Sequence, residues 1–185
     1  CRHFLKSSGI KFVKNMPHNN NSDDLFEARK IYAKLKIPED IFDIEFPFQT
    51  PNSFLYDYIL KKQLSATVNV KDENIIYYIS EYLQSIRFSS ELVNSEKPKQ
   101  IFMSHPISVQ CAPMCWIGSK YGIPVTTLFG NYGLPRFIKI KQPKDIFIAI
   151  DRPIPEDFKK LSENQKTKLH DIGELYLDHR INGQT

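Results

Sequence analysis

Apolar positions recur at helical or strand spacing along most of the chain, and the first fifty residues show the least regular pattern. Residues 10–13 predict a short strand, and the polar run that follows predicts a loop. Ser22 or Asp23 then begins a helix that Pro38 ends. The apolar positions of this helix are Leu25, Ala28, Ile31, Tyr32 and Leu35. Residues 41–48 alternate between apolar and polar side chains, and Pro47 limits them to an edge strand or an extended segment.

The pattern is clearer after residue 70. Asp72 caps a long amphipathic helix that ends by Pro98, with one apolar stripe formed by Ile75, Ile76, Ile79, Tyr82, Leu83 and Ile86. Short apolar runs at 101–103, 124–129 and 146–150 predict buried strands, and a helix over 109–121 separates the first two. Pro113 fits the first turn of that helix, and Gly122 lies just past its end. Residues 155–183 predict further helix.

This order of strands and helices predicts an α/β fold: a Rossmann-like, mostly parallel sheet with helices on both faces. Such sheets bind ligands beyond the carboxyl ends of their strands.

Composition supports one globular domain over residues 1–185. A chain of 185 residues with 41% hydrophobic side chains can bury roughly 70% of its unfolded surface without disulfides or metals. Three cysteines are too few and too irregular for a disulfide framework, which favours a reducing compartment. No run approaches the roughly 20 apolar residues of a membrane helix. The first residue is Cys1, so we expect a processed chain or a piece of a longer one.

The net charge of +4 is too small for a nucleic-acid-binding arm or a polybasic membrane anchor. Its distribution is uneven, because residues 97–144 contain seven basic residues and no Asp or Glu: Lys97, Lys99, Lys120, Arg136, Lys139, Lys141 and Lys144. This segment would attract an anion. Alternatively, two buried strands simply leave few surface positions for acids.

Several classes of enzyme lack their motifs here. The chain has no G-x-G-x-x-G, no G-x-x-x-x-G-K-[ST] and no G-x-S-x-G, which disfavours dehydrogenases, P-loop enzymes and α/β-hydrolases. The five histidines show no metal-ligand spacing, and no D-x-D is present to hold a metal-bound diphosphate. Cys111 and Cys115 lie one helical turn apart, and we interpret them as small core residues rather than zinc ligands.

Ser104 and His105 follow the first predicted buried strand, where the ligand crevice of an α/β sheet lies. A histidine there can act as a general base near neutral pH, or it can merely bond a loop carbonyl. The same position nominates residues after the later strands as substrate contacts: Gly130, Asn131, Tyr132 and Arg152. Arg136 is a further candidate substrate contact, because it is basic. Gly130 and Gly133 would let the backbone approach a ligand closely, and a plain turn explains these two glycines at least as well.

Asp57 lies between Tyr56 and Tyr58 in an otherwise apolar segment. Aromatic rings beside a carboxylate suit a carbohydrate, whose ring faces stack on aromatics and whose hydroxyls need acceptors. The alternative is a helix with Asp57 facing solvent.

Taken in order, these segments resemble the N-terminal half of bacterial capsule and surface-polysaccharide biosynthesis proteins, which are glycosyltransferases of the two-domain GT-B type. The resemblance covers roughly residues 54–183 and is weakest over 1–50. It is carried by a series of short segments: Leu55-Tyr-Asp-Tyr-Ile-Leu60, Thr67-Val-Asn69, the helix from Asp72, Phe102-Met-Ser-His105 and Tyr121-Gly-Ile-Pro-Val125. The chain departs from the family pattern after His105, where Pro106 and the stretch from Cys111 to Cys115 stand.

The resemblance implies an acceptor-binding domain with His105 as the catalytic base and Asp57 as the second candidate. The implied partners are a saccharide or lipid-linked saccharide acceptor and a nucleotide sugar, which a second domain would chiefly bind. We expect no cofactor, no metal and no nucleic-acid partner. We expect a cytoplasmic protein, with association at the inner face of the membrane as an option. The chain stops at Thr185, about where a second domain would begin, so the isolated chain would not catalyse transfer. A non-catalytic α/β module that binds carbohydrate or protein is the alternative.

Overall fold

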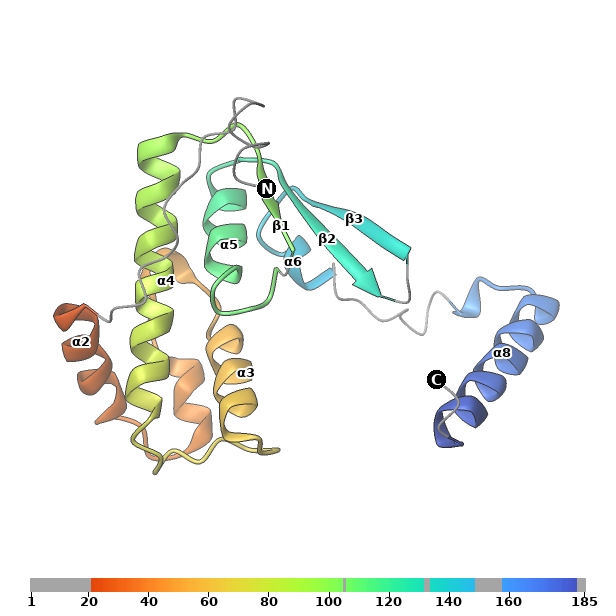
Figure 1. The fold of residues 1–185 in the computed structure, drawn as a ribbon, viewed down its shortest axis with the longest axis horizontal. Coiled ribbons are helices and arrows are strands. Elements are labelled where there is room, and N and C mark those ends of the chain that lie inside the picture. Colours follow the sequence, from red (N-terminus) through yellow and green to blue (C-terminus); the bar gives the residue numbers. More distant parts are fainter. Residues whose placement is uncertain (1–20, 105, 132–133, 149–157, 183–185) are drawn as a thin grey trace, which may run out of the picture. The chain divides into compact units, whose positions relative to one another are not determined.

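The computed structural model describes residues 21–104, 106–131, 134–148 and 158–182 (Figure 1). The chain divides into two compact units, Cys1–Ala149 and Ile150–Thr185. Within the described ranges the protein is of mixed α/β class, with a small sheet and a larger helical part. None of the described helices is both long enough and apolar enough to cross a membrane.

The helix α4, Ile75–Glu96, is the centre of the first unit, and α2 (Ser22–Tyr32), α3 (Asn52–Gln63) and α5 (Ala112–Lys120) pack against it (Figure 1). Its predicted apolar stripe is confirmed, since Ile75, Ile79, Tyr82 and Ile86 are almost completely buried. The Asp72 carboxylate accepts the backbone N–H of Asn74 at 3.0 Å just before the helix begins. Burial of this stripe supplies most of the apolar contact between the helices of the unit.

The sheet has three strands in the order β1-β2-β3: β1 is Ile101–Met103, β2 is Val125–Asn131 and β3 is Leu134–Ile140. The predicted strands at 101–103 and 124–129 are confirmed, and they pair in parallel from Ile101↔Val125 to Met103↔Thr127. The strand β3 pairs antiparallel with β2, so the described sheet is mixed rather than mostly parallel. The sequence pattern does not predict β3, which contains Pro135. An edge strand tolerates a proline because its missing N–H leaves no partner strand without a donor.

The helix α5 covers one face of the sheet. Gly118 of α5 lies so close to β1 and β2 that a Cβ there would stand 2.4 Å from Ile101 Cδ1 and 3.5 Å from Val125 Cγ2. Pro113 occupies the first turn of this helix, as its sequence position predicts. Gly122 has φ +73° just beyond the C-terminal end, a conformation that glycine adopts without a steric penalty.

The strand alternative for residues 41–48 and the strand prediction for 146–150 are wrong, and in both places polar side chains bond the backbone locally. Residues 41–43 and 47–48 belong to two 3₁₀ turns, η1 (Pro38–Asp43) and η2 (Pro47–Gln49), and only the residues between them keep the extended backbone that the other alternative predicts, with Ile44 and Phe46 in the extended region. The Asn52 side chain donates to the carbonyls of Phe42 and Ile44 at 2.7 and 2.8 Å. In a strand, these carbonyls would instead accept backbone N–H groups from a neighbouring strand. The predicted strand at 146–150 begins instead as the helix α6 (Asp145–Ile148), because the Asp145 carboxylate accepts the backbone N–H groups of residues 141 and 142.

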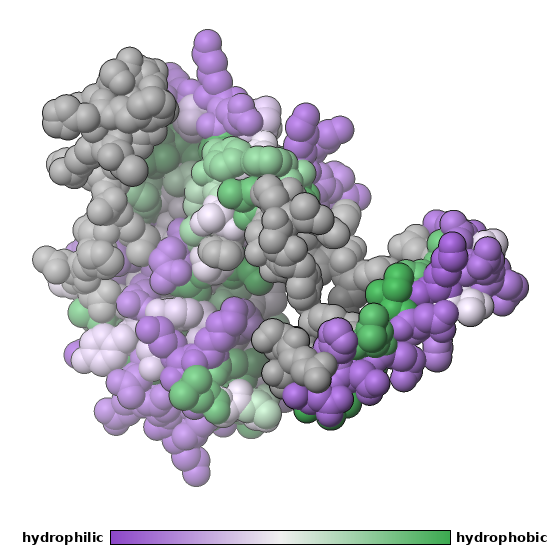
Figure 2. Space-filling model, turned by 45° about the vertical axis from the view of Figure 1, so that its right-hand side comes forward, coloured by the Kyte–Doolittle hydropathy of each residue, from purple (hydrophilic) through white to green (hydrophobic). Residues whose placement is uncertain are grey.

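The second unit contains α8, Glu163–Ile181, in agreement with the helical prediction for the end of the chain. Most of its side chains are exposed, and several of those are large and apolar: Leu169, Ile172, Leu175, Leu177 and Ile181. Figure 2 shows mainly hydrophilic residues along this helix, with hydrophobic ones beside them. The predicted strand at 10–13 lies outside the described residues.

Candidate functional site

A cavity of about 210 Å³ lies between α3 and the loop that leads from β1 to α5. It brings the aromatic segment around Asp57, which the sequence singles out, against residues 107–110 of the loop, which the sequence does not. Its lining is Phe54, Asp57, Tyr58, Lys61, Lys62, Ile107, Ser108, Val109 and Gln110. Because the loop begins where β1 ends, the cavity lies on the ligand-binding side expected of an α/β sheet.

The helix α3 supplies the charged side of the cavity. Phe54, Leu55 and Ile59 are buried, whereas the Asp57 side chain is about half exposed, so the helical alternative for this segment is confirmed. Asp57 Oδ2 forms an ion pair with Lys61 Nζ at 2.7 Å, and both side chains are about half exposed. One helical turn separates the two residues, which is the spacing that lets such pairs meet.

Tyr58 is fixed within the same wall. Its hydroxyl donates a hydrogen bond to the Glu81 carboxylate of α4, and Lys62 Nζ lies 5.3 Å from the centre of its ring. Burial, followed by the hydrogen bond to Glu81, raises the pKa of the Tyr58 phenol. The hydrogen bond to Glu81 holds Tyr58 in place, so its ring forms a fixed side of the cavity.

The loop supplies the other wall, and its backbone is tied to two helices. The Ser108 carbonyl accepts the N–H groups of Cys111 and Ala112 at 2.9 and 2.7 Å. The Gln110 carbonyl accepts the Ser85 hydroxyl of α4 at 3.4 Å. Val109 is 1% exposed and anchors the loop in the core. The side chains of Ser108 and Gln110 thus line the cavity from an anchored backbone.

These groups fit a small polar ligand that carries hydroxyls. A carboxylate can accept hydroxyl protons, two ammonium groups can donate, and the Ser108 hydroxyl and the Gln110 amide can do both. Phe54 and Ile107 add apolar surface. The volume is below the roughly 300–1,000 Å³ of pockets that enclose a drug-sized ligand, so the cavity suits one small group of a longer molecule.

The other predicted contacts fall in different places. Ser104 is exposed directly after β1, and Tyr56 stacks on Phe42 with ring centroids 4.9 Å apart, outside the cavity lining. Asn131 ends β2 four residues beyond Thr127, the last partner of β1, and four strand residues span roughly 13 Å. Asn131 and Ser104 therefore share an edge of the sheet without being level along the strands.

Within the hairpin, Gly130 pairs with Pro135 and Arg136 with Phe129. The remaining site predictions lie outside the described residues: His105, Tyr132 and Arg152.

Of the nine lining residues, the sequence nominated only Asp57 and Tyr58. The polar residues that it missed are Lys61, Lys62, Ser108 and Gln110. Lys61 stands four residues after Asp57, a signal that becomes readable once the segment is treated as a helix. Ser108 and Gln110 give no such signal, because only the tertiary contact between α3 and the loop places them at the cavity.

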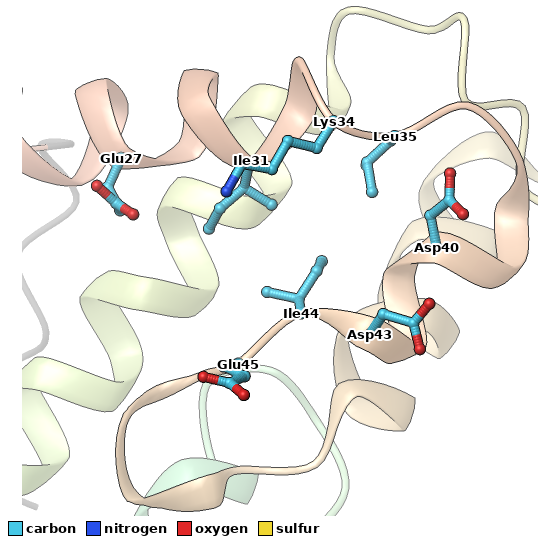
Figure 3. A pocket seen from close by; sticks show the side chains of 8 residues that line it. All are labelled: Glu27, Ile31, Lys34, Leu35, Asp40, Asp43, Ile44 and Glu45. Carbon is cyan, nitrogen blue, oxygen red and sulfur yellow. The ribbon is translucent and has the colours of Figure 1, made fainter.

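A larger groove of about 490 Å³ runs beside α2, with four carboxylates around an apolar floor (Figure 3). Its lining is Glu27, Ile31, Lys34, Leu35, Asp40, Asp43, Ile44 and Glu45. Asp40 accepts the N–H groups of Lys36 and Ile37 at 2.6 and 3.0 Å, so this carboxylate holds the start of η1. The groove contains no residue that the sequence nominates, and an adjoining groove of about 460 Å³ beside residues 44–52 contains none either.

The described residues include no group of three or more His, Cys, Asp or Glu side chains placed to hold a metal ion. Cys115 is completely buried, and burial raises the pKa of its thiol to about 12, as a small core residue would show. Comparison of the chain with known families, curated proteins and solved structures gives no match.

Proposed function

We propose that this chain is the acceptor-binding domain of a glycosyltransferase that transfers a sugar from a nucleotide sugar in capsule or surface-polysaccharide biosynthesis. The cavity between α3 and the loop after β1 is the observation that carries the proposal. It joins the Asp57 segment, one of the stretches on which the resemblance to these enzymes rests, to residues 107–110, which follow in sequence the stretch that ends at His105.

The proposed fold is the Rossmann-like N-terminal domain of a GT-B enzyme, with the nucleotide sugar bound chiefly by a second domain. The parallel strands β1 and β2 are connected along the chain through α5, and this connection is consistent with such a domain. The antiparallel β3 would be an addition to it at the edge.

In this proposal an acceptor hydroxyl loses its proton to a base, and its oxygen attacks the anomeric carbon as the bond to the nucleoside diphosphate breaks. His105 is the proposed base, with Asp57 as the second candidate. Asp57 is held by Lys61 and otherwise accepts hydrogen bonds from acceptor hydroxyls, while Ser108 and Gln110 bind neighbouring hydroxyls. Lys62 would hold a negative group of the acceptor.

The test is a calorimetric titration of the chain with short polysaccharide acceptors, nucleotide sugars, UDP and CMP. We expect acceptor binding that Asp57→Asn weakens by about tenfold or more, since a hydrogen bond to a charged group contributes roughly 1.5–3 kcal/mol. Asp43→Asn is the matched control, because Asp43 is an exposed carboxylate of η1 outside this cavity. In the complete enzyme, His105→Ala should lower kcat by about 10²- to 10⁴-fold.

Two results would contradict the proposal. Tight nucleotide binding without acceptor binding would assign the chain to the donor side or to another family. Acceptor affinity that is the same in Asp57→Asn and Asp43→Asn would remove the cavity from the site. Acceptor binding without turnover in the complete protein would favour the non-catalytic module instead.

A further inference from the structure

The face of the sheet opposite α5 carries an exposed pair of aromatic rings. Ile101, Val125 and Ile140 are level with one another in the register and point into the core, so the alternate residues of each strand point the other way. Phe102 of β1 and Phe137 of β3 are on this open face, 58% and 64% exposed. Their ring centroids lie 6.0 Å apart, so the two rings meet across the intervening strand β2.

A polar side chain lies beside the rings. Thr126 of β2 is level with Phe102 on one side and Lys139 on the other, but it is only 8% exposed. The exposed Gln100 donates its amide to the Thr126 hydroxyl at 3.2 Å, which holds Gln100 at the end of the sheet where β1 begins. Aromatic rings with an adjacent hydrogen-bonding group suit a carbohydrate.

Positive charge gathers at the same end of the sheet. Lys139 lies on the open face, Lys99 lies two residues before β1, and Lys141 directly follows β3, which puts all three toward one end of the sheet. All three are exposed, and within the described part of the chain none of them forms an ion pair. The stretch 97–144 has no Asp or Glu, and the Asp145 carboxylate that follows it accepts the backbone N–H groups of residues 141 and 142. Charges of one sign with no internal partner favour an anionic ligand.

We propose that the open sheet face, defined by Phe102, Phe137, Lys139 and the adjoining Gln100, binds an anionic saccharide, namely one that carries carboxylate or phosphate groups. The apolar faces of its sugar rings pack on the two phenyl rings, and its charges pair with Lys139 and with the lysines at the adjoining end. The choice of a saccharide over other polyanions rests on the proposed function. This surface would hold a length of the acceptor chain apart from the cavity that holds the reacting group.

The experiment titrates the full chain with short oligogalacturonates, with neutral dextran oligosaccharides of the same length and with oligothymidylate. We expect the uronate to bind best, and raising salt from about 50 to about 200 mM to weaken its binding because the contact is between opposite charges. The double variant Phe102→Ala/Phe137→Ala should lower uronate affinity by about tenfold or more, and Lys139→Gln by about threefold.

Matched controls come from α2. Phe26→Ala removes a phenylalanine that is 61% exposed and has Lys30 Nζ 4.3 Å from its ring centre, and Lys34→Gln removes an exposed lysine. Both should leave uronate affinity unchanged. Because every substituted side chain is exposed, unfolding followed by Trp116 fluorescence should show the same midpoint in all of these variants.

The outcomes separate this surface from the proposed function. Equal affinity for dextran, preference for oligothymidylate, or full affinity in the Phe102→Ala/Phe137→Ala variant would each overturn the proposal. Loss of uronate binding in that variant but not in Asp57→Asn would support it. Acceptor affinity that is indifferent to Asp57 would count against the cavity and the proposed function while leaving this result in place.

Discussion

The carboxylates of the helical part differ in what surrounds them, and Asp24 is the most enclosed of those described. Asp24 Oδ2 lies 2.5 Å from Arg87 Nη2 of α4, and the Asp24 side chain is 12% exposed against 38% for Arg87. Burial raises the pKa of Asp24 more than the Arg87 guanidinium lowers it. The pair therefore positions α2 on α4 while the charged carboxylate itself works against folding.

The pKa of Asp40 is shifted in the opposite direction, so the two carboxylates should change the pH dependence of stability with opposite signs. The N–H groups of Lys36 and Ile37 hold the pKa of Asp40 below its usual value. A raised pKa in the folded state means that ionisation of Asp24 destabilises the fold. The stability that the protonated Asp24 contributes is therefore lost as pH rises through the folded pKa. A lowered pKa means that Asp40 stabilises the fold at neutral pH and that this stabilisation is lost as pH falls through its folded pKa.

We therefore expect Asp24→Asn to gain stability relative to the natural chain as pH rises from about 3.5 to about 6.5, and Asp40→Asn to lose it. Urea unfolding followed by Trp116 fluorescence across this pH range measures both. Parallel pH profiles for the two variants would show that the enclosure of Asp24 and the backbone bonds of Asp40 do not set their ionisation.

At the scale of elements, the contact of α5 with the sheet depends on Gly118, which lets the helix approach β1 closely. Alanine here would gain about 1 kcal/mol of helix propensity, yet its Cβ would stand 2.4 Å from Ile101 Cδ1. Overpacking of this kind costs about 1–3 kcal/mol. With the gain in propensity subtracted, we expect Gly118→Ala to lower the free energy of unfolding by up to about 2 kcal/mol.

The companion variant is Ile101→Val, which removes the crowded Cδ1 and alone costs about 0.5–1.5 kcal/mol. Denaturant unfolding should show the double variant to be more stable than the sum of the two single changes by about 0.5 kcal/mol or more. Additive effects would mean that Ile101 does not obstruct the new methyl group.

The helix α4 and the strands β1 and β2 could be predicted from the sequence, whereas the structure of residues 41–48 could not. The three elements follow from their apolar residues, because each buries side chains against α5 or its neighbours. Residues 41–48 also alternate, yet the Asn52 side chain bonds the carbonyls of residues 42 and 44, and none of the described strands pairs with them. Alternation fixes which side chains can share a face, and it does not supply the neighbouring strand.

The candidate site likewise contains residues that the sequence could predict and residues that it could not. Asp57 and Tyr58 could be nominated because their composition is unusual within one segment. Ser108 and Gln110 contribute only because the loop after β1 reaches α3, which is a contact between segments some fifty residues apart. Such a contact is decided by the packing of α3 and α5 on α4 rather than by any local pattern.

On the scale of the whole molecule, the two compact units have different sources of stability. The first buries apolar side chains from every helix around α4, and its Trp116 donates to the Phe48 carbonyl at 3.2 Å. In the second, α8 leaves most of its side chains exposed, so its helicity depends largely on its own backbone and propensity. Helices that bury few of their side chains are only marginally stable in water and melt gradually.

Gly173 tests this difference, because it lies inside α8 with no atom within 4 Å of a Cβ added there. Gly173→Ala should stabilise α8 by about 1 kcal/mol. We expect a stronger helical circular-dichroism signal before the main thermal transition, with an unchanged midpoint for Trp116 fluorescence. Gly173→Pro should weaken the early signal and leave the same midpoint. If the Trp116 midpoint instead rose with alanine and fell with proline, α8 would melt as part of the first unit, and its apolar side chains would contribute to the stability of that unit.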